Sequence, residues 1–378
     1  MEKSEYKICS RCIMDISDSE IVLNEEGICN HCLRYDELLH NRVQLEDGEK
    51  SLNQIVTRIK AKRRSAQDYD CIIGVSGGVD STYVAYLCKK LGLNPLAIHF
   101  DNGWNSELAV RNIEDCLNIL GIDLVTEVIR WKHFKEMQKA FLFASVPDGE
   151  VPTDHAINAL LFREANKRGI KYIINGMNFQ TESLSVRTWA YGHSDWKYIQ
   201  SVTRKFSNIK DFNFYPHFSL LDLIKYVTIK QIKVVSILNY IDYKKDEVIK
   251  ILENELNWRN YGGKHYESIY TRFYQGFLLP NKFKIDKRRG HLSDLIRSHQ
   301  MTRERALVEI SKPAYIDSNL EQEDIVFVKK KLELTDNEFE KILSSKNKTY
   351  RVFRNNEYKI SMLKKALNFL RKQKLYSK

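Results

Sequence analysis

The stretch that decides the fold is residues 72–87, IIGVSGGVDSTYVAYL, where a short apolar run gives way to Ser-Gly-Gly-Val-Asp-Ser and then to a helical pattern. The apolar run predicts a buried strand, and the spacing of apolar residues after the glycines predicts an amphipathic helix. Two glycines at a strand-to-helix junction let backbone N–H groups approach an anion at the positive end of the helix dipole. The stretch therefore predicts a phosphate-binding loop in an α/β fold.

The residues around this loop repeat the same alternation. Apolar runs follow at LAIHFDNGW, DLVTEVI and KYIINGMN, and the predicted helices between them end at Gly92, Gly121 and Gly169. Short strands that alternate with helices predict a doubly wound parallel sheet covered on both faces. We assign residues 68–240 to this nucleotide domain, residues 44–67 to a helical connector and residues 241–378 to a mainly helical region for substrate or partner binding.

The composition fits a globular protein with a sizeable core. The chain has 378 residues, of which 43% are hydrophobic, and a formal net charge of +11. Such an excess of basic residues is typical of proteins that bind nucleic acid, an acidic partner or a polyphosphate substrate, and it is also found on solvated helix faces. No apolar run is long enough for a membrane span, and the first residues do not resemble a signal peptide, so a cytoplasmic protein is expected.

Four of the seven cysteines form two CxxC pairs, and the pairs are separated by 16 residues. This spacing is typical of a structural zinc site in which four thiolates surround one Zn²⁺ ion. The predicted metal ligands, within an N-terminal segment of residues 1–43, are Cys9, Cys12, Cys29 and Cys32. An iron–sulfur cluster, a redox dithiol pair, or His31 in place of one cysteine are the alternatives.

The loop sequence resembles the PP-loop, SGGxDS, of the ATP pyrophosphatase superfamily, and it matches neither GxxxxGK[ST] nor GxGxxG. The resemblance implies that ATP is cleaved between its α and β phosphates while a substrate oxygen becomes adenylylated. Asp80 is expected to help hold Mg²⁺. The stretch HFDNGW looks like the Asp-Asn-Gly segment of GMP synthetases, which would place Asp101 and Asn102 beside the nucleotide. For the glycine loop, the alternative is a turn that merely needs glycine. For HFDNGW, the alternative is an ordinary strand-ending turn. The predicted nucleotide-binding residues are Ser76, Gly77, Gly78, Val79, Asp80, Ser81, Asp101, Asn102 and Gly176.

The C-terminal half adds a further resemblance. Residues 262–277, GGKHYESIYTRFYQGF, and residues 278–307, LLPNKFKIDKRRGHLSDLIRSHQMTRERAL, resemble the N-acetyl sugar amidotransferases of surface-polysaccharide and flagellin-glycan biosynthesis. The first signature segment would contribute Lys264, His265, Glu267 and Arg272, and the second would contribute Lys282, Asp286, Lys287 and Arg288. We predict catalytic roles for Asp80, Lys264, Arg272 and Lys287. The three basic side chains would neutralise a departing pyrophosphate, and Asp80 would help hold Mg²⁺. Structural ion pairs are the alternative for each. Asn175, Gly176 and Asn178 would line the sugar or the adenosine.

The family resemblance implies an acetamidino product. ATP would activate the acetamido oxygen of a UDP- or CMP-linked sugar, and ammonia would then displace AMP. Cys71, Cys88 and Cys116 fall on a predicted strand and two predicted helices, so we interpret them as core thiols rather than glutaminase nucleophiles. Ammonia is therefore expected from a separate glutaminase subunit, with or without a cyclase-like channel subunit. Asp80, Asp101 and Asp154 are candidates for a metal ligand or general base.

Two other functions fit parts of the sequence. A tRNA-thiolating PP-loop enzyme also joins CxxC pairs to a PP-loop, but such enzymes usually read SGGKDS, and Val79 stands at the position of that lysine. Nucleic acid is thus a less favoured partner. A non-catalytic binding module with a degenerate loop is disfavoured, because every fixed loop position is intact.

Overall fold

The computed structural model describes residues 6–43, 47–63, 68–184, 186–263, 266–315 and 317–372. At its centre lies one sheet of five parallel strands in the order β3-β2-β1-β4-β5. The strands are β1 (Cys71–Gly74), β2 (Pro95–Asp101), β3 (Leu124–Val128), β4 (Tyr172–Asn175) and β5 (Lys233–Ser236). The predicted parallel α/β sheet is confirmed, and β5 is a strand that the sequence analysis did not identify.

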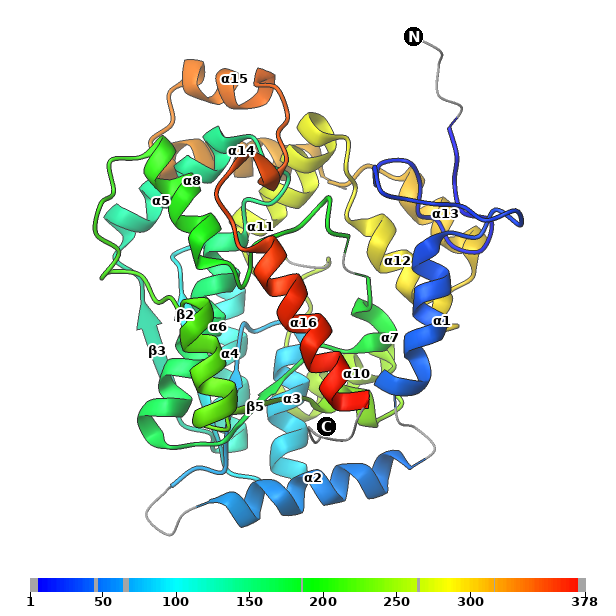
Figure 1. Cartoon of the computed structure of the whole chain (residues 1–378), viewed down its shortest axis with the longest axis vertical. Helices are drawn as coiled ribbons and strands as arrows, with labels where there is room; N and C mark the ends of the chain where they lie inside the picture. The colour runs from blue at the N-terminus through cyan, green and yellow to red at the C-terminus, as the bar shows by residue number, and fades with distance from the viewer. Residues whose placement is uncertain are drawn as a thin grey trace.

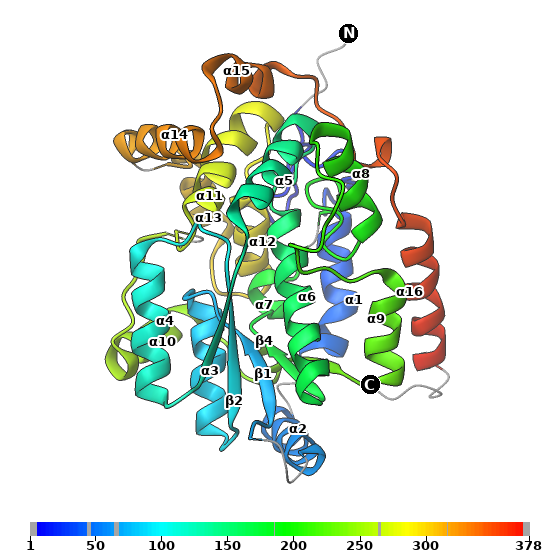
Figure 2. The ribbon, with the colours of Figure 1, turned by 90° about the vertical axis from the view of Figure 1, so that its left-hand side faces the viewer.

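Helices cover both faces of this sheet, as expected for a doubly wound fold (Figures 1 and 2). Ile72 of β1 packs into a core shared with the helices on one face, and Ile73 packs into a core on the other face. The first face carries α5 (Trp131–Ala144), α6 (Val151–Arg168) and α8 (Trp196–Phe206). The second face carries α2 (Gly48–Lys62), α3 (Val79–Lys90), α4 (Glu107–Leu120) and α10 (Lys245–Leu256).

The helix ends follow the signals in the sequence. Ser106 caps α4 by accepting a hydrogen bond from the backbone N–H of Ala109. Gly121 and Gly169 end α4 and α6 in the left-handed conformation that glycine adopts without strain. A capping box between Thr335 and Glu338 opens α15 (Asp336–Ser344).

Besides α8 and β5, several short elements lie between β4 and α10. They are α7 (Phe179–Glu182), α9 (Leu220–Ile224), the π-helix η1 (Lys225–Ile229) and the 3-10 helix η2 (Ile237–Tyr240). Val248, Leu252 and Leu256 of α10 are buried in the same core as β1. The core of the nucleotide domain therefore continues past residue 240.

The rest of the C-terminal region is helical. It comprises α11 (Ile269–Phe273), the π-helix η3 (Tyr274–Phe283), α12 (Arg288–Arg297), α13 (Arg303–Ser311), α14 (Ser318–Leu332), α15, the 3-10 helix η4 (Tyr350–Val352) and α16 (Glu357–Lys372). Figure 1 shows α2 at one end of the molecule and α14 and α15 at the other. The N-terminal α1 (Asn30–Arg42) lies near α12, where the Arg297 guanidinium is 5.5 Å from the ring centroid of Tyr35. None of the helices in the described ranges has the length and apolar character needed to cross a bilayer.

Candidate active site

The predicted PP-loop joins the carboxyl end of β1 to the start of α3. Gly77 has a φ of +80°, and a Cβ there would lie 2.8 Å from the carbonyl oxygen of Ala109. The hydroxyls of Ser76 and Ser81 lie 3.2 Å apart, and Ser81 Oγ also accepts from the Ser76 backbone N–H at 3.2 Å. Val79 opens α3, with Asp80 in its first turn. The structure therefore brings both hydroxyls, the glycines and the helix N-terminus together, as anion binding requires.

Two side chains from the C-terminal half hold this loop. The Gly77 carbonyl accepts hydrogen bonds from Trp258 Nε1 and from Tyr261 Oη, each at 2.8 Å. The two donors are 181 and 184 residues away along the chain. No local pattern marks these residues, so sequence reasoning missed them.

Asp80 is held by a residue that the sequence analysis also missed. The phenol of Tyr243 donates a short hydrogen bond to Asp80 Oδ1, and Tyr243 is completely buried. Burial raises the pKa of Tyr243 well above its ordinary value, and the Asp80 charge raises it further. The phenol therefore stays protonated and fixes one oxygen of the carboxylate.

Gly176 follows β4 and lies against the same first turn of α3. A Cβ at this position would lie 3.0 Å from the Asp80 carbonyl carbon, so only glycine fits without displacing the backbone. The strand order reverses between β1 and β4, since β2 and β3 lie on one side and β5 on the other. Ligands of doubly wound folds bind in the crevice at such a switch point, outside the carboxyl ends of the strands.

Unsatisfied polar atoms mark this edge of the sheet. Within the described part of the chain, Asn175 Oδ1 and Asn178 Nδ2 are buried without a hydrogen-bond partner. Asn178 uses its other amide atom to cap α7, where Oδ1 accepts from Thr181 N at 2.7 Å. Buried polar atoms normally have partners, so these two fit a ligand at the position predicted for the sugar or the adenosine.

The Asp-Asn-Gly segment ends β2 at the same edge. Asp101 Oδ1 accepts from the Gly103 N–H at 2.8 Å, and Lys331 of α14 donates to the Gly103 carbonyl. Asn102 is buried and bonds to Trp104 N and Thr153 Oγ1 at 3.1 and 3.3 Å. Both amide atoms of Asn102 are therefore used within the protein. Asp101 is half-buried.

The first C-terminal signature segment pairs with this loop. Ser106 N donates to Glu267 O and Ile269 N donates to Trp104 O, both at 2.9 Å. The Glu267 carboxylate lies 3.5 Å from the position that a Cβ on Gly78 would take. Of this segment's predicted residues, Glu267 thus reaches the PP-loop, while Lys264 and His265 lie outside the described residues.

The other predicted basic residues take different positions. Arg272 forms a bidentate ion pair with Asp324 of α14, at 2.6 and 2.7 Å, and so connects α11 to α14. Lys282 donates to the Ser345 carbonyl at 2.7 Å. Asp286 and Arg288 pair with each other, with the Arg288 Nη2 to Asp286 Oδ2 distance at 2.7 Å.

Lys287 lies against α6 instead. Its Nζ is 3.5 Å from Glu150 Oε2, directly before the first turn of that helix. Of the residues predicted to be catalytic, Lys287 and Asp80 therefore lie at the carboxyl edge of the sheet, whereas Arg272 is engaged by α14.

The four cysteines converge as predicted. All are buried, and their sulfurs lie within 4.8 Å of one another, with Cys9 and Cys32 Sγ 4.0 Å apart and Cys12 and Cys29 Sγ 3.7 Å apart. Four thiolates at zinc-bond length from one ion would stand about 3.8 Å apart. The donor set therefore fits a tetrahedral metal. His31 bonds instead to Asp18 Oδ2, at 2.7 Å.

Arginines of the C-terminal region hold this cysteine segment. Arg303 donates to the carbonyls of Cys9 and Cys12 at 3.0 Å each, and Arg289 donates to the Ile13 carbonyl at 2.9 Å. Arg297 is 2% exposed; in the part of the chain that is described, its Nε and Nη1 have no hydrogen-bond partner. Its Nη2 donates to Asp294 Oδ1 at 2.6 Å, so this buried cation is paired with a buried carboxylate.

The other three cysteines are buried in the core around β1, α3 and α4. Cys71, Cys88 and Cys116 are at most 1% exposed, and burial raises the pKa of the Cys116 thiol to about 12. Their prediction as core thiols is confirmed.

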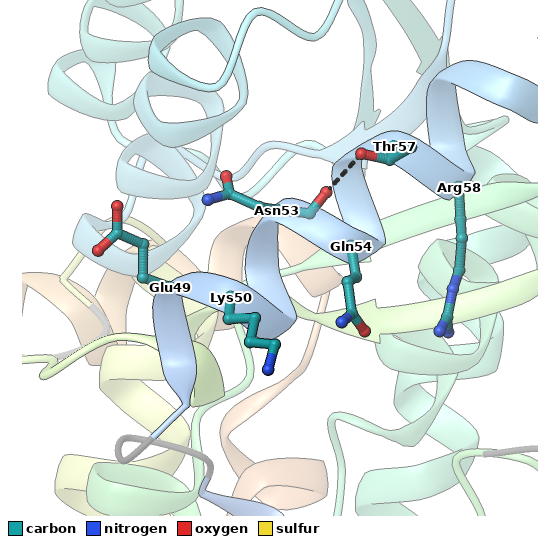
Figure 3. Close-up of a pocket in the computed structure, with 6 residues that line it drawn as sticks. All are labelled: Glu49, Lys50, Asn53, Gln54, Thr57 and Arg58. Carbon is teal, nitrogen blue, oxygen red and sulfur yellow. Dashed lines mark hydrogen bonds between the residues drawn. The ribbon is translucent and has the colours of Figure 1, made fainter.

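Two surface hollows lie on the helices that cover the second face of the sheet. The larger, of about 600 Å³, follows the exposed side of α2 and is lined by Glu49, Lys50, Asn53, Gln54, Thr57 and Arg58 (Figure 3). The second, of about 520 Å³, lies between α4 and the end of α10. Neither is lined by a predicted site residue.

Comparison with protein families agrees with this geometry. Residues 51–140, which include the PP-loop, match the NAD synthase family. Residues 267–367 match the C-terminal domain of WbpG-like lipopolysaccharide (LPS) biosynthesis proteins. The chain joins a PP-loop domain of the NAD synthase type to a WbpG-like C-terminal domain. The match to the NAD synthase family confirms the predicted PP-loop superfamily. The match to the WbpG-like domain confirms the predicted link to surface-polysaccharide biosynthesis.

Two solved structures are similar to this chain at low TM-scores. The U34-tRNA thiolase NcsA from Methanococcus maripaludis, with its [4Fe-4S] cluster, is 15% identical over 77% of this chain and 82% of its own, with a TM-score of 0.35. The NH3-dependent NAD synthetase from Campylobacter jejuni is 16% identical over 56% of this chain and 93% of its own, with a TM-score of 0.29. These TM-scores are too low to bear on function. No curated protein matches the chain.

Proposed function

We propose that this protein is an ATP-dependent, AMP-forming amidotransferase of surface-polysaccharide biosynthesis. Its substrate would be a nucleotide-activated acetamido sugar, whose acetamido oxygen is adenylylated and then replaced by ammonia to leave an acetamidino group. The observation that carries the proposal is the contact of Trp258 and Tyr261 with the Gly77 carbonyl. It places the ATP loop against the chain that leads into the WbpG-like domain.

The residues of the loop supply the activation step. The N–H groups at the start of α3 and the hydroxyls of Ser76 and Ser81 would bind the pyrophosphate, and Asp80 would hold Mg²⁺. Mg²⁺, when bound, neutralises charge on the departing phosphates. Tyr243 orients the Asp80 carboxylate. The polar atoms of Asn175 and Asn178 at the switch point would orient the group that is adenylylated.

Ammonia would come from a separate glutaminase subunit, with or without a cyclase-like channel subunit. A glutaminase nucleophile must be exposed to its substrate, and every cysteine in the described residues is buried. The four-cysteine site would hold a structural Zn²⁺ ion that fixes the N-terminal segment on α12 and α13.

The same cysteine burial weakens the tRNA-thiolation alternative. Cys71 and Cys88, on either side of the PP-loop in sequence, are completely buried in the core. Neither is placed to carry sulfur to a large nucleic acid.

The test is pyrophosphate release from ATP and Mg²⁺ in the presence of ammonium chloride, with UDP- and CMP-linked acetamido sugars compared against bulk tRNA. The proposal predicts release that depends on one sugar and a product in which NH has replaced oxygen. Release that depends on tRNA alone would contradict it.

A further inference from the structure

A group of charged side chains lies at the N-terminal end of α6, and the activation step described above does not use it. We call it the charged cluster; it consists of Asp148, Glu150, Asp154, His193 and Lys287. Its residues come from the loop before α6, from the first turn of α6, from the loop before α8 and from the residue before α12.

Close contacts hold these groups together. His193 Nε2 lies 2.9 Å from Asp148 Oδ2 and 3.5 Å from Asp154 Oδ2. Lys287 Nζ lies 3.5 Å from Glu150 Oε2. Gln275 of η3 donates to that same Glu150 oxygen at 2.8 Å. Three carboxylates therefore share two cationic side chains.

The charged cluster has a buried floor and an open rim. The side chains of Asp148 and Glu150 are 5% and 12% exposed, whereas those of Asp154 and His193 are 45% and 41% exposed. Burial among protein atoms raises the pKa of Asp154 to about 6. The charge of His193 lowers this pKa, and the charges of Glu150 and Asp148 raise it. Asp154 is thus the carboxylate that a small molecule can reach.

Two buried phenols feel the charge of these carboxylates. In the described parts of the chain, the hydroxyls of Tyr270 and Tyr198 are buried without a hydrogen-bond partner. Tyr270 lies close enough to Glu150 and Asp148 for both charges to add to the effect of burial on its pKa, and Asp148 acts likewise on Tyr198.

The charged cluster lies at the same edge of the sheet as the PP-loop. Because α6 precedes β4 in a parallel sheet, it starts at the carboxyl edge. Asn102, at the end of β2, donates to Thr153 in the first turn of α6 at 3.3 Å. The contact between Lys287 and Glu150 joins the residues that directly precede α12 and α6.

The chemistry of the charged cluster selects its ligand. Carboxylates exceed cations, so an anion is disfavoured. Among the described residues, only the four cysteines offer three or more ligand atoms close enough together for a metal ion. Carboxylate and phenol oxygens are hydrogen-bond acceptors, and they match a small cation with several N–H donors.

We propose that the charged cluster binds ammonium and that Asp154 removes one of its protons, so that ammonia is generated beside the activated sugar. This inference rests on the proposed function. Ammonium transfers one proton to the Asp154 carboxylate, and the nitrogen lone pair then forms a bond to the imidate carbon. The bond from that carbon to the AMP oxygen breaks, AMP leaves with the electron pair, and the amidine remains protonated. Asp148, Glu150, Lys287 and His193 set the charge around Asp154.

The test separates activation from amination. Sugar-dependent exchange of labelled pyrophosphate into ATP, without ammonia, measures activation; AMP release as a function of ammonium chloride concentration measures amination. Asp154→Asn should keep the exchange, raise the KM for ammonium and lower AMP release by about 100-fold or more, the usual contribution of a general base. Asp154→Glu should restore part of the loss. Hydroxylamine, which is uncharged at neutral pH, should restore AMP release in Asp154→Asn.

The matched control is Asp211→Asn, the same change at an exposed carboxylate in the loop before α9. If Asp154→Asn responds to ammonium as Asp211→Asn does, or loses the exchange as well, the role of Asp154 is refuted. Failure of hydroxylamine to restore activity would refute it too. Absence of sugar-dependent exchange in the unmodified protein would overturn the proposed function, and this inference with it.

Discussion

Replacing Tyr243 by phenylalanine removes the phenol oxygen that donates a hydrogen bond to Asp80 Oδ1. A hydrogen bond to a charged group contributes about 1.5–3 kcal/mol, and about 1.4 kcal/mol corresponds to a factor of ten in rate. If Asp80 must hold Mg²⁺ against the departing pyrophosphate, Tyr243→Phe should lower kcat/KM for pyrophosphate release by about 10- to 150-fold. The ring remains in its buried site, so no apolar cavity forms and the fold should persist.

The assay is sugar-dependent pyrophosphate release at several Mg²⁺ concentrations, with thermal unfolding measured in parallel. Tyr86→Phe is the matched control, because Tyr86 lies on the same helix α3 and donates to Glu255 Oε1 at 2.8 Å, away from the loop. The reasoning predicts a loss in Tyr243→Phe that high Mg²⁺ partly reverses, and near-normal activity in Tyr86→Phe. Equal activity in the two variants would refute the role of Tyr243.

Four further outcomes are expected. Asp80→Ala should abolish pyrophosphate release and leave the metal content unchanged; near-normal turnover would defeat the assignment of the loop. Arg272→Met should lower the free energy of unfolding by about 3–5 kcal/mol, because it leaves Asp324 buried without its cation; chemical denaturation that shows no change would contradict this. Removal of the metal by a chelator should lower the melting temperature and release one Zn²⁺ per chain, whereas release of iron would replace the zinc assignment. Burial lowers the pKa of His193, but the charges of Asp148 and Asp154 outweigh burial and bring this pKa to about 9. The stability that protonated His193 adds is therefore complete below about pH 6.5 and is lost as the pH rises through 9. His193→Gln should flatten the dependence of the unfolding free energy on pH over that window.

Local signals in the sequence predicted the parts of the structure that depend on local order. The strand-to-helix junction at residues 72–87, the helix end at Gly121, and the two CxxC pairs each have their determinants within a few neighbouring residues. Strand β5 escaped prediction because the residues around Lys233–Ser236 mix apolar and basic side chains with no clear period of two or 3.6.

The contacts that complete the site could not be predicted in this way. Trp258, Tyr261 and Tyr243 reach the loop from more than 160 residues away, and nothing in their local sequence indicates it. Arg272 shows the converse limit: the resemblance predicts a catalytic cation, but whether an arginine faces a substrate or a buried aspartate depends on where α14 packs. Its catalytic role stays a prediction.

The charged cluster illustrates the same point. Asp154 was a candidate base and Lys287 a candidate cation from the sequence, but Asp148 and His193 carry no motif. The turn before α6 and the loop before α8 bring the two side chains together, and only the tertiary structure shows that contact.

The central claim is that the PP-loop and the WbpG-like domain together activate an acetamido sugar. The most direct measurement is exchange of labelled pyrophosphate into ATP, without ammonia, across a panel of UDP- and CMP-linked acetamido sugars, their deacetylated counterparts and bulk tRNA. The account predicts exchange with one acetamido sugar and none with its deacetylated form. Exchange that is indifferent to the acetyl group, or that appears only with tRNA, would contradict it.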